Sequence, residues 1–313
     1  MVDLAVVIVT WNSRDYVLDA LSSLFADLEA NGPSADVYVV DSASSDDTVQ
    51  AIVTAFPQVK MITSQQNLGF GKANNLALQD IGFGRVDVQN LPPAVYLLNP
   101  DTITQSGATR TLYDTLMANP TWGLVGAALS YEDGSFQHGA FAFPGLRQLW
   151  IEFFPTPGRF IEGAFNGRYP RSDYESGQPF PVDFTLGATM MLRREVIQQT
   201  GMFDEQFFMY CEEVDWAWRI HDAGWKVCCV PSAQVIHLSG KSTGQARPRS
   251  IINLWTSRLR LFAKHYPAWK YALARRLIVL GMRRKMQQFD LVTGDKAVFE
   301  AYQTVCEMAL KQP

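Results

Sequence analysis

Over about the first 130 residues, short apolar segments alternate with amphipathic ones, and this alternation constrains the fold more than any other feature. The apolar segments are rich in β-branched residues, as in strands buried on both faces, whereas apolar residues recur at helical spacing in the segments between them. Such an alternation builds a parallel sheet with crossover helices. We expect strands at 4–9, 36–40, 59–63, 94–98 and 124–130, and helices at 13–30, 46–56, 71–80 and 105–118.

Polar residues stand directly after three of these strands. Ligands of an open α/β sheet bind beyond the carboxyl ends of the strands, so these residues are candidates for a binding site. An aspartate there can accept a hydrogen bond from a ribose or base, or ligate a hard divalent cation, which prefers oxygen. Each is explained equally well as an Asx turn or a helix cap. The residues are Thr10, Trp11 and Asn12, then Asp41, then Asn99, Pro100 and Asp101.

A glycine-containing turn, Asn67-Leu68-Gly69-Phe70-Gly71, opens the helix that contains Asn75. The backbone N–H groups of such a turn and the helix dipole can meet an anion. The turn matches neither the dinucleotide-binding fingerprint nor the P-loop, so a purely structural role remains open. His237 follows an apolar segment, and a lone histidine in that setting is more often structural than a ligand.

The segment between Phe203 and Arg219 places three carboxylates, Glu212, Glu213 and Asp215, at the start of a helix predicted over 212–223. Aromatic residues precede them, and apolar neighbours raise the pKa of a carboxyl group until it becomes a usable base near neutral pH. Glu212 or Glu213 would be that base. Acids also complement the dipole of a helix N-terminus, and Asp215 with Arg219 can form a structural ion pair.

Beyond residue 131 the periodicity weakens. Glu132-Asp133-Gly134 predicts a hairpin turn. Residues 139–181, rich in Gly, Pro and aromatics, predict a partly ordered insertion that forms a lid or an acceptor wall. Strand-like segments are expected at 182–192, 225–230 and 235–238, and helix over 250–288 with a break near Pro267.

Charge is distributed unevenly along the chain. Residues 1–246 carry 14 Lys or Arg and 27 Asp or Glu, whereas residues 247–290 carry 11 Lys or Arg and one acid, Asp290. Apolar residues interleave with these basic ones, and a basic amphipathic helix can lie on an anionic membrane surface. The same pattern fits a helical subdomain whose basic residues are solvated or pair with the acidic body. Self-association through these helices, to a homo-oligomer, also remains open.

The whole chain has 313 residues, is 47% hydrophobic and has a net charge of −4. These values indicate a globular protein and argue against a basic nucleic-acid-binding protein. Its four cysteines form no CxxC pair, so a reducing cytosol fits better than a disulfide framework. We expect neither a signal peptide nor a transmembrane helix, and hence a cytoplasmic protein, peripheral on the inner face of the cell membrane if the basic segment binds it.

Six short motifs stand in a recognisable order. They are Val7-Ile8-Val9-Thr10-Trp11-Asn12, Val40-Asp41-Ser42, Gln66-Asn67-Leu68-Gly69-Phe70, Leu97-Leu98-Asn99-Pro100-Asp101, Phe207-Phe208-Met209-Tyr210-Cys211-Glu212-Glu213-Val214-Asp215-Trp216 and Val235-Ile236-His237. In this order they resemble the family 2 glycosyltransferases, and within them the rhamnosyltransferase-like branch. The resemblance covers residues 4 to about 242. It implies a GT-A fold, a Rossmann-like and mostly parallel α/β sheet with flanking helices, over 1–245, followed by a basic helical subdomain over 246–313.

The resemblance also implies roles for individual residues. A nucleotide-sugar donor would be bound by Thr10, Trp11, Asn12, Asp41, Asn67, Gly69, Asn75, Asn99 and Asp101. A divalent metal, Mn²⁺ or Mg²⁺, would be held by Asp101 and His237. Glu213 would be the catalytic base, with Glu212 as the alternative, while Asp215, Trp216 and Arg219 would contact the acceptor or be structural.

The implied reaction is an inverting transfer of a sugar, with L-rhamnose from dTDP-rhamnose as the best guess, to a saccharide or lipid-diphosphate-linked acceptor. Two positions depart from the family pattern: Asn99 replaces the first Asp of the DXD motif, and Glu213 replaces the commoner Asp. Two alternatives remain. One is a degenerate, non-catalytic nucleotide- or carbohydrate-binding member of the fold. The other is a nucleotidyltransferase, although the short loop 10–14 lacks the glycines that such an enzyme needs.

Overall fold

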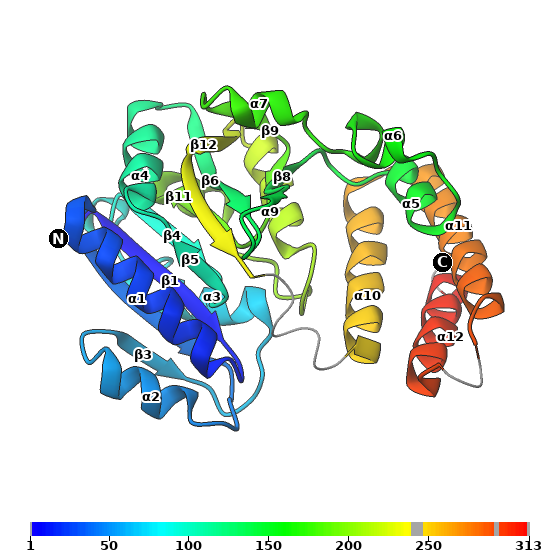
Figure 1. Ribbon diagram of the computed structural model, residues 1–313, viewed down its shortest axis with the longest axis horizontal. Coiled ribbons are helices and arrows are strands. Elements are labelled where there is room, and N and C mark those ends of the chain that lie inside the picture. Colours follow the sequence, from blue (N-terminus) through cyan, green and yellow to red (C-terminus); the bar gives the residue numbers. More distant parts are fainter. Residues whose placement is uncertain (1, 239–246, 291–293, 312–313) are drawn as a thin grey trace.

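The computed structural model describes residues 2–238, 247–290 and 294–311. An α/β part comes first, and a group of helices lies beside it at the carboxyl-terminal end (Figure 1). The boundary expected at 245/246 lies outside the described residues.

A ten-stranded sheet forms the centre of the α/β part. Its order is β3-β2-β1-β4-β11-β6-β12-β5, with β7 on β6 and β9 on β12. Neighbours from β3 to β4 are parallel, as are β6 and β12, whereas β11 runs antiparallel between β4 and β6. The mostly parallel sheet expected from the alternation is confirmed. The strands are β1 Leu4–Thr10, β2 Ala35–Asp41, β3 Lys60–Thr63, β4 Ala94–Leu98, β5 Thr102–Thr104, β6 Trp122–Ser130, β7 Phe136–Gln137, β9 Phe180–Val182, β11 Thr189–Arg193 and β12 Lys226–His237.

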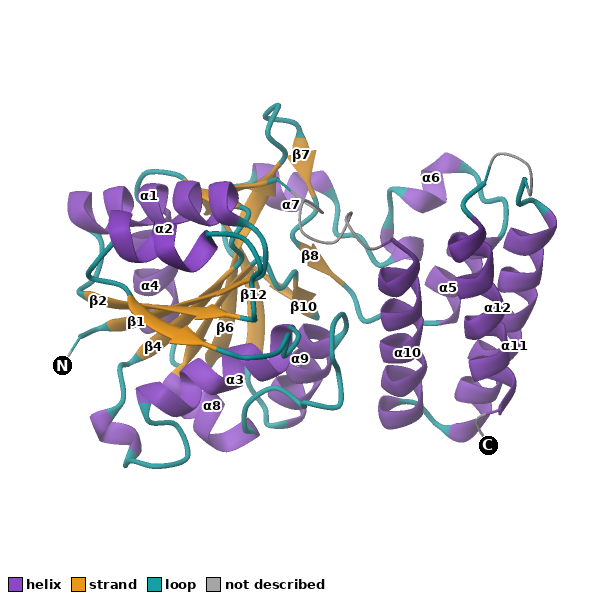
Figure 2. Cartoon of the chain, turned by 90° about the horizontal axis from the view of Figure 1, so that it is seen from below, coloured by secondary structure: helices purple, strands orange, loops and turns teal. Residues whose placement is uncertain are grey.

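Helices cover both faces of this sheet (Figure 2). Alternate residues of β1 enter different cores: Val6 and Ile8 pack under α1 and α4, while Val7 packs under α3 and α9. Such burial on both faces explains the continuous apolar runs. Cys228 and Cys229 on β12 divide between the same two cores, so their thiols are packing groups. The helices are α1 Arg14–Asn31, α2 Thr48–Ala55, α3 Phe70–Ile81, α4 Ala108–Ala118, α8 Arg194–Thr200 and α9 Glu212–Asp222.

Several predicted boundaries were wrong. The strand-like segment 182–192 is divided among β9, β10 (Phe184–Thr185) and β11, because the chain turns at 186–188. The two segments at 225–230 and 235–238 are a single strand, β12, whose register on β6 is irregular between Val230 and Gln234. The helix predicted from residue 105 begins later because Gly107, at φ 81°, caps it. Sequence periodicity also missed α8 and β5.

The segment 139–181 is richer in structure than expected. It contains β8 (Ala140–Phe141), which pairs with β10, and the helices α5 (Leu146–Phe153), α6 (Gly158–Ile161) and α7 (Arg171–Glu175). Helix α5 packs with the carboxyl-terminal helices in a third core, where Phe153 stacks on Trp255 with ring centroids 4.9 Å apart. These elements are too short for periodicity to reveal. The carboxyl-terminal helices are α10 Arg247–His265, α11 Ala268–Gln287 and α12 Lys296–Lys311.

The break predicted near Pro267 is confirmed, since Pro267 stands between α10 and α11. In the part of the chain that the structure describes, none of the helices has the length and hydropathy needed to cross a bilayer.

Candidate active site

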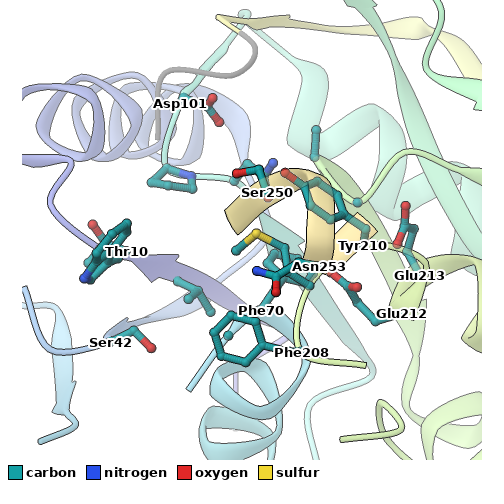
Figure 3. Close-up of a pocket in the computed structure, with 18 of the residues that line it drawn as sticks. Thr10, Ser42, Phe70, Asp101, Phe208, Tyr210, Glu212, Glu213, Ser250 and Asn253 are labelled. Atoms are coloured by element: carbon teal, nitrogen blue, oxygen red, sulfur yellow. The ribbon is translucent and has the colours of Figure 1, made fainter. Parts of the chain in front are cut away.

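A cavity of about 400 Å³ opens at the carboxyl ends of β1 and β4. The turn 186–188 before β11, the loop before α9 and the first turns of α10 complete its walls. Figure 3 shows Thr10 and Asp101 on one side of this cavity and Glu212 and Glu213 on the other. The sheet edge predicted to bind a ligand therefore faces an acidic helix N-terminus across one space.

Thr10 and Trp11 line the cavity, whereas Asn12 and Asp41 do not. Asn12 Oδ1 accepts a hydrogen bond from the Ser45 backbone N at 2.7 Å. Both carboxylate oxygens of Asp41 accept hydrogen bonds from Ser44, one from its backbone N and one from its hydroxyl. Asp41 thus fixes the loop that follows β2 through local hydrogen bonds, a structural role, and both residues shape the loops beside the cavity.

The glycine turn contacts the loop that carries the acids. Gly69 adopts φ 73°, and a Cβ on it would lie 2.0 Å from the Phe208 carbonyl oxygen. That oxygen accepts a hydrogen bond from the Phe70 backbone N at 3.1 Å. Asn67 lines the cavity and accepts a hydrogen bond from the Gly69 backbone N. The turn thus holds the wall that contains Asn67 against the loop that carries the acids.

Asn75 lies outside the cavity. Its amide accepts a hydrogen bond from the Phe203 backbone N at 3.0 Å and donates one to the Phe203 carbonyl at 2.9 Å. Asn75 is almost fully buried and attaches α3 to the segment before α9. The structure gives this side chain a packing role and does not bring it to the other donor-site candidates.

Asp101 and His237 meet at the cavity wall. Asp101 Oδ1 lies 3.5 Å from His237 Nε2, and both side chains are buried. His237 Nδ1 lies 3.2 Å from Gln137 Oε1; donation from Nδ1 to this oxygen leaves Nε2 as a free acceptor beside Asp101. One carboxylate oxygen and one imidazole nitrogen fit a divalent cation whose other ligands come from a substrate. Asn99 also lines the cavity, and no group of three or more acidic, His or Cys ligands occurs among the described residues.

Two consecutive residues in left-handed conformation precede the acids. Tyr210 has φ 70° and Cys211 has φ 66°, and such strain costs roughly 1–3 kcal/mol per residue and persists only where the surroundings impose it. Ser257 on α10 supports the loop by donating a hydrogen bond to the Met209 carbonyl at 2.8 Å. The other two non-glycine residues with positive φ in the described chain, Asn12 and Ala43, flank the opposite wall. Backbone strain is therefore concentrated around this cavity.

Glu212 and Glu213 begin α9, and both line the cavity. Burial raises the pKa of Glu213 to about 7. Burial, and then the neighbouring Glu213, raise the pKa of Glu212 well above its usual range. Glu212 Oε2 has no hydrogen-bond partner among the described groups. Burial thus favours the neutral form of both carboxyl groups, and more strongly that of Glu212.

Asp215 is fully buried and points away from the cavity. It accepts from Arg219 Nε at 3.0 Å, from Lys264 Nζ at 2.7 Å and from His265 Nε2 at 2.7 Å. Burial opposes ionisation of this carboxyl, but the hydrogen bonds from His265 and Lys264 and the charge of Arg219 hold its pKa at about 2.

Arg219 also donates to the carbonyls of Thr200 and Met202, and Trp216 is buried with its Nε1 on Thr200 Oγ1. The arrangement of these three residues fits the structural alternative.

Sequence reasoning missed much of the cavity. Arg249, Ser250 and Asn253 come from α10, and among the described lining residues Arg249 and His237 are the basic ones. The charge pattern identified the basic segment. It did not predict that the start of α10 lies at the sheet edge, because no local sequence pattern encodes such a tertiary contact. The remaining missed residues are Ser42, Phe70, Leu186, Gly187, Ala188, Phe208, Met209 and Tyr210.

Sequence comparison identifies a family for residues 3–251, which match the model described as glycosyltransferase like family 2. A curated relative from Mycobacterium tuberculosis, N-acetylglucosaminyl-diphospho-decaprenol L-rhamnosyltransferase, is 31% identical over 249 residues. The alignment covers 77% of this chain and 78% of that protein.

Solved structures agree on the fold. GalNAc-T7 with UDP, GalNAc and Mn²⁺ is 14% identical at a TM-score of 0.60, and the match covers 100% of this chain but only 56% of that one. The mannosyltransferase PcManGT from Pyrobaculum calidifontis, with GDP-Man and Mn²⁺, is 16% identical at a TM-score of 0.54, and the match covers 100% of this chain and 81% of that one. The chain belongs to glycosyltransferase family 2 and has the GT-A fold.

Proposed function

We propose that this protein transfers a sugar from a nucleoside diphosphate to an acceptor hydroxyl with inversion at the anomeric carbon. One observation carries the proposal: a single cavity joins the Asp101–His237 pair to the acids Glu212 and Glu213. A nucleotide-sugar spans such a site with its diphosphate at the first pair and its anomeric carbon near the acids. The catalytic domain in this proposal is 1–245, and 246–313 is a helical subdomain that completes the cavity.

The donor end is formed by the edge of the sheet. Thr10 and Trp11 line the side where the nucleoside would sit, and Asp101 with His237 would hold a divalent metal, Mn²⁺ or Mg²⁺. Such a metal neutralises the negative charge that develops on the leaving diphosphate. With Asn99 in place of an acid, the protein offers one carboxylate there, and Arg249 from α10 supplies positive charge to the same cavity. Arg249 would therefore help to hold the diphosphate of the donor.

Glu213 is the general base of this proposal. A carboxyl with a pKa of about 7 is partly ionised at neutral pH and accepts the proton of an acceptor hydroxyl efficiently, an effect of about 10²–10⁴ in rate. Burial and the neighbouring Glu213 raise the pKa of Glu212, which disfavours a second negative charge in the site. The adjacent Cys211 is no nucleophile, because burial raises the pKa of its thiol. A single displacement by the acceptor fits a site with a base and no dedicated nucleophile.

The identities of the donor sugar and the acceptor are inferred from the curated relative and not from the cavity. The Mycobacterium tuberculosis protein is named as a transferase of L-rhamnose to an N-acetylglucosaminyl-diphospho-decaprenol. This likeness supports L-rhamnose from dTDP-rhamnose as donor sugar and a saccharide on a lipid diphosphate as acceptor for this chain. A cytoplasmic enzyme that works at the membrane face fits such an acceptor.

Calorimetry with dTDP-, UDP- and GDP-sugars, with and without Mn²⁺, tests the donor site. We expect dTDP-rhamnose to bind, Mn²⁺ to tighten binding, and His237→Ala to remove the tightening. His221→Gln is the control, since that imidazole contacts the Asp183 carbonyl outside the cavity. Metal-independent binding would contradict the role given to Asp101 and His237. Binding of donor without any transfer to acceptors would favour a non-catalytic member of the family.

A further inference from the structure

The outer face of α11 carries a stripe of exposed apolar and basic residues. Trp269 is 64% exposed, Leu273 40% and Leu280 53%. With Arg276 and Arg283 they follow one another at intervals of three or four residues, so they share one face of the helix. The opposite face of α11, with Ile278 and Met282, is buried in the third core. We call the five residues Trp269, Leu273, Arg276, Leu280 and Arg283 the α11 stripe.

The stripe is positively charged without compensation. Neither α10 nor α11 contains an Asp or Glu. The side chains of Arg276 and Arg283 form no hydrogen bond or ion pair with any residue that the structure describes. By contrast, the nearby Arg275 and Lys285 are engaged: Arg275 donates to the Ala309 carbonyl at 2.7 Å, and Lys285 lies 3.8 Å from Glu152. The two stripe arginines are left for a partner outside the chain.

A groove adjoins the stripe between α11 and the end of α12. It is lined by Arg276 and Leu280 from the stripe and by Val279, Ala309 and Leu310, and Leu310 is 56% exposed. Figures 1 and 2 place α11 and α12 at the far end of the helical group from the sheet. The exposed apolar residues and the unpaired arginines thus lie on a surface that the catalytic part does not cover.

We propose that the α11 stripe docks on an anionic lipid bilayer. Tryptophan and leucine side chains insert among the acyl-chain ends and headgroups, while the arginines remain at the anionic phosphates. A second copy of the chain fits the same face poorly, since a two-fold contact would bring Arg276 and Arg283 against their own counterparts with no acid on either helix. This inference goes beyond the proposed function, and it places the enzyme at the surface where a lipid-linked acceptor resides.

Vesicle sedimentation of the full chain tests the proposal, with vesicles of phosphatidylcholine alone and vesicles that also contain phosphatidylglycerol. We expect binding to the anionic vesicles that weakens as NaCl is raised, because salt screens the arginines. The double variant Arg276→Gln with Arg283→Gln should lower the partition coefficient about 25-fold, at about fivefold per basic residue. The control, Arg85→Gln with Lys226→Gln, makes the same change in net charge on exposed residues of the α/β part and should bind as the wild type.

The apolar half of the stripe needs its own pair of variants. Trp269→Ser with Leu273→Ser should reduce binding to anionic vesicles at low and high salt alike, whereas Val53→Ser with Val86→Ser, two exposed residues of the α/β part, should not. Thermal melts check that all variants fold. The proposal would be overturned if the two control pairs lost as much vesicle binding as the stripe variants did. It would also be overturned if the stripe variants bound vesicles as well as the wild type does. A dimer, detected by light scattering, that the stripe variants dissociate would likewise overturn it. The readout is independent of sugar transfer, so its failure leaves the proposed reaction untouched.

Discussion

Gly69 lies directly against the carbonyl oxygen of Phe208, so closely that a Cβ at position 69 would come within 2.0 Å of it. The next residue, Phe70, donates a hydrogen bond to the same oxygen. This contact joins the turn after β3 to the loop that positions Glu212 and Glu213. The turn on the donor side of the cavity therefore packs directly against the loop on the acid side, and the contact requires a glycine at position 69.

Gly69→Ala should displace the 208–211 loop and lower kcat/KM at least tenfold while the protein stays folded. The methyl group cannot coexist with the Phe208 carbonyl, and the positive φ adds roughly 1–2 kcal/mol of strain. Gly134→Ala is the matched control, because Gly134 also has a positive φ but no atom lies within 4 Å of its Cβ position. Transfer assays and thermal melts of the two variants check the prediction, and equal activity in both would contradict it.

Asp215→Asn should destabilise the protein by about 3–5 kcal/mol, since it removes the buried carboxylate that pairs with Arg219 and Lys264 and accepts a hydrogen bond from His265. Urea unfolding measures the loss. Asp114→Asn breaks an exposed Arg–Asp pair of the same i, i+4 spacing and should cost less than about 0.5 kcal/mol.

The stability that Asp215 contributes depends on pH in a definite sense. Its pKa is lowered from 3.8 to about 2 in the folded chain, so the contribution is complete above 3.8 and is lost as the pH falls towards 2. The difference in unfolding free energy between the wild type and Asp215→Asn should narrow over that window. A difference that stays constant would show that Asp215 is not held ionised by its partners.

The pH profile of kcat/KM should report Glu213. A base with a pKa of about 7 is active when ionised, so the rate should rise by about tenfold per pH unit below 7 and level off above it. Steady-state assays across this range, with an acceptor that does not titrate there, measure the profile. A flat profile between pH 5 and 8 would mean that the base has an ordinary carboxyl pKa.

Asn99→Asp should strengthen metal binding, because it adds a second carboxylate to a cavity wall that already holds Asp101 and His237. The Mn²⁺ concentration that half-saturates donor binding should fall several-fold. Asn90→Asp, an exposed change in the loop before β4, should leave it unchanged. An unchanged Mn²⁺ requirement in Asn99→Asp would place the metal elsewhere.

The sequence predicted those parts of the structure that local patterns encode. The alternation predicted the parallel strands, because burial on both faces leaves a continuous apolar run, and the strand exits correctly located Thr10 and Asp101 at the cavity. Asp41 and Asn75 illustrate the limit: polar residues near a binding edge look alike in sequence whether they face a ligand or cap a turn. Only the fold shows that Asp41 binds Ser44 and Asn75 binds Phe203.

Long-range packing explains why the position of Arg249 and the packing of α5 were not predicted from the sequence. Arg249 reaches the cavity because α10 is held against α9 through Lys264, His265 and Asp215, contacts about 50 residues apart in sequence. Helix α5 joins α10 and α11 through Phe153, which fills the space left by Gly281. Neither relationship has a local signature.

The central claim is that Glu213 acts as the base of a single-displacement transfer. Glu213→Gln keeps the shape of the side chain but cannot accept the proton, so it should lower kcat at least 100-fold while donor affinity stays within about twofold. Glu132→Gln, an exposed change in the β6–β7 turn, is the control. Turnover and donor calorimetry on these two variants and on Glu212→Gln form the direct test. Retained turnover in Glu213→Gln, with loss in Glu212→Gln, would contradict the assignment and make Glu212 the base.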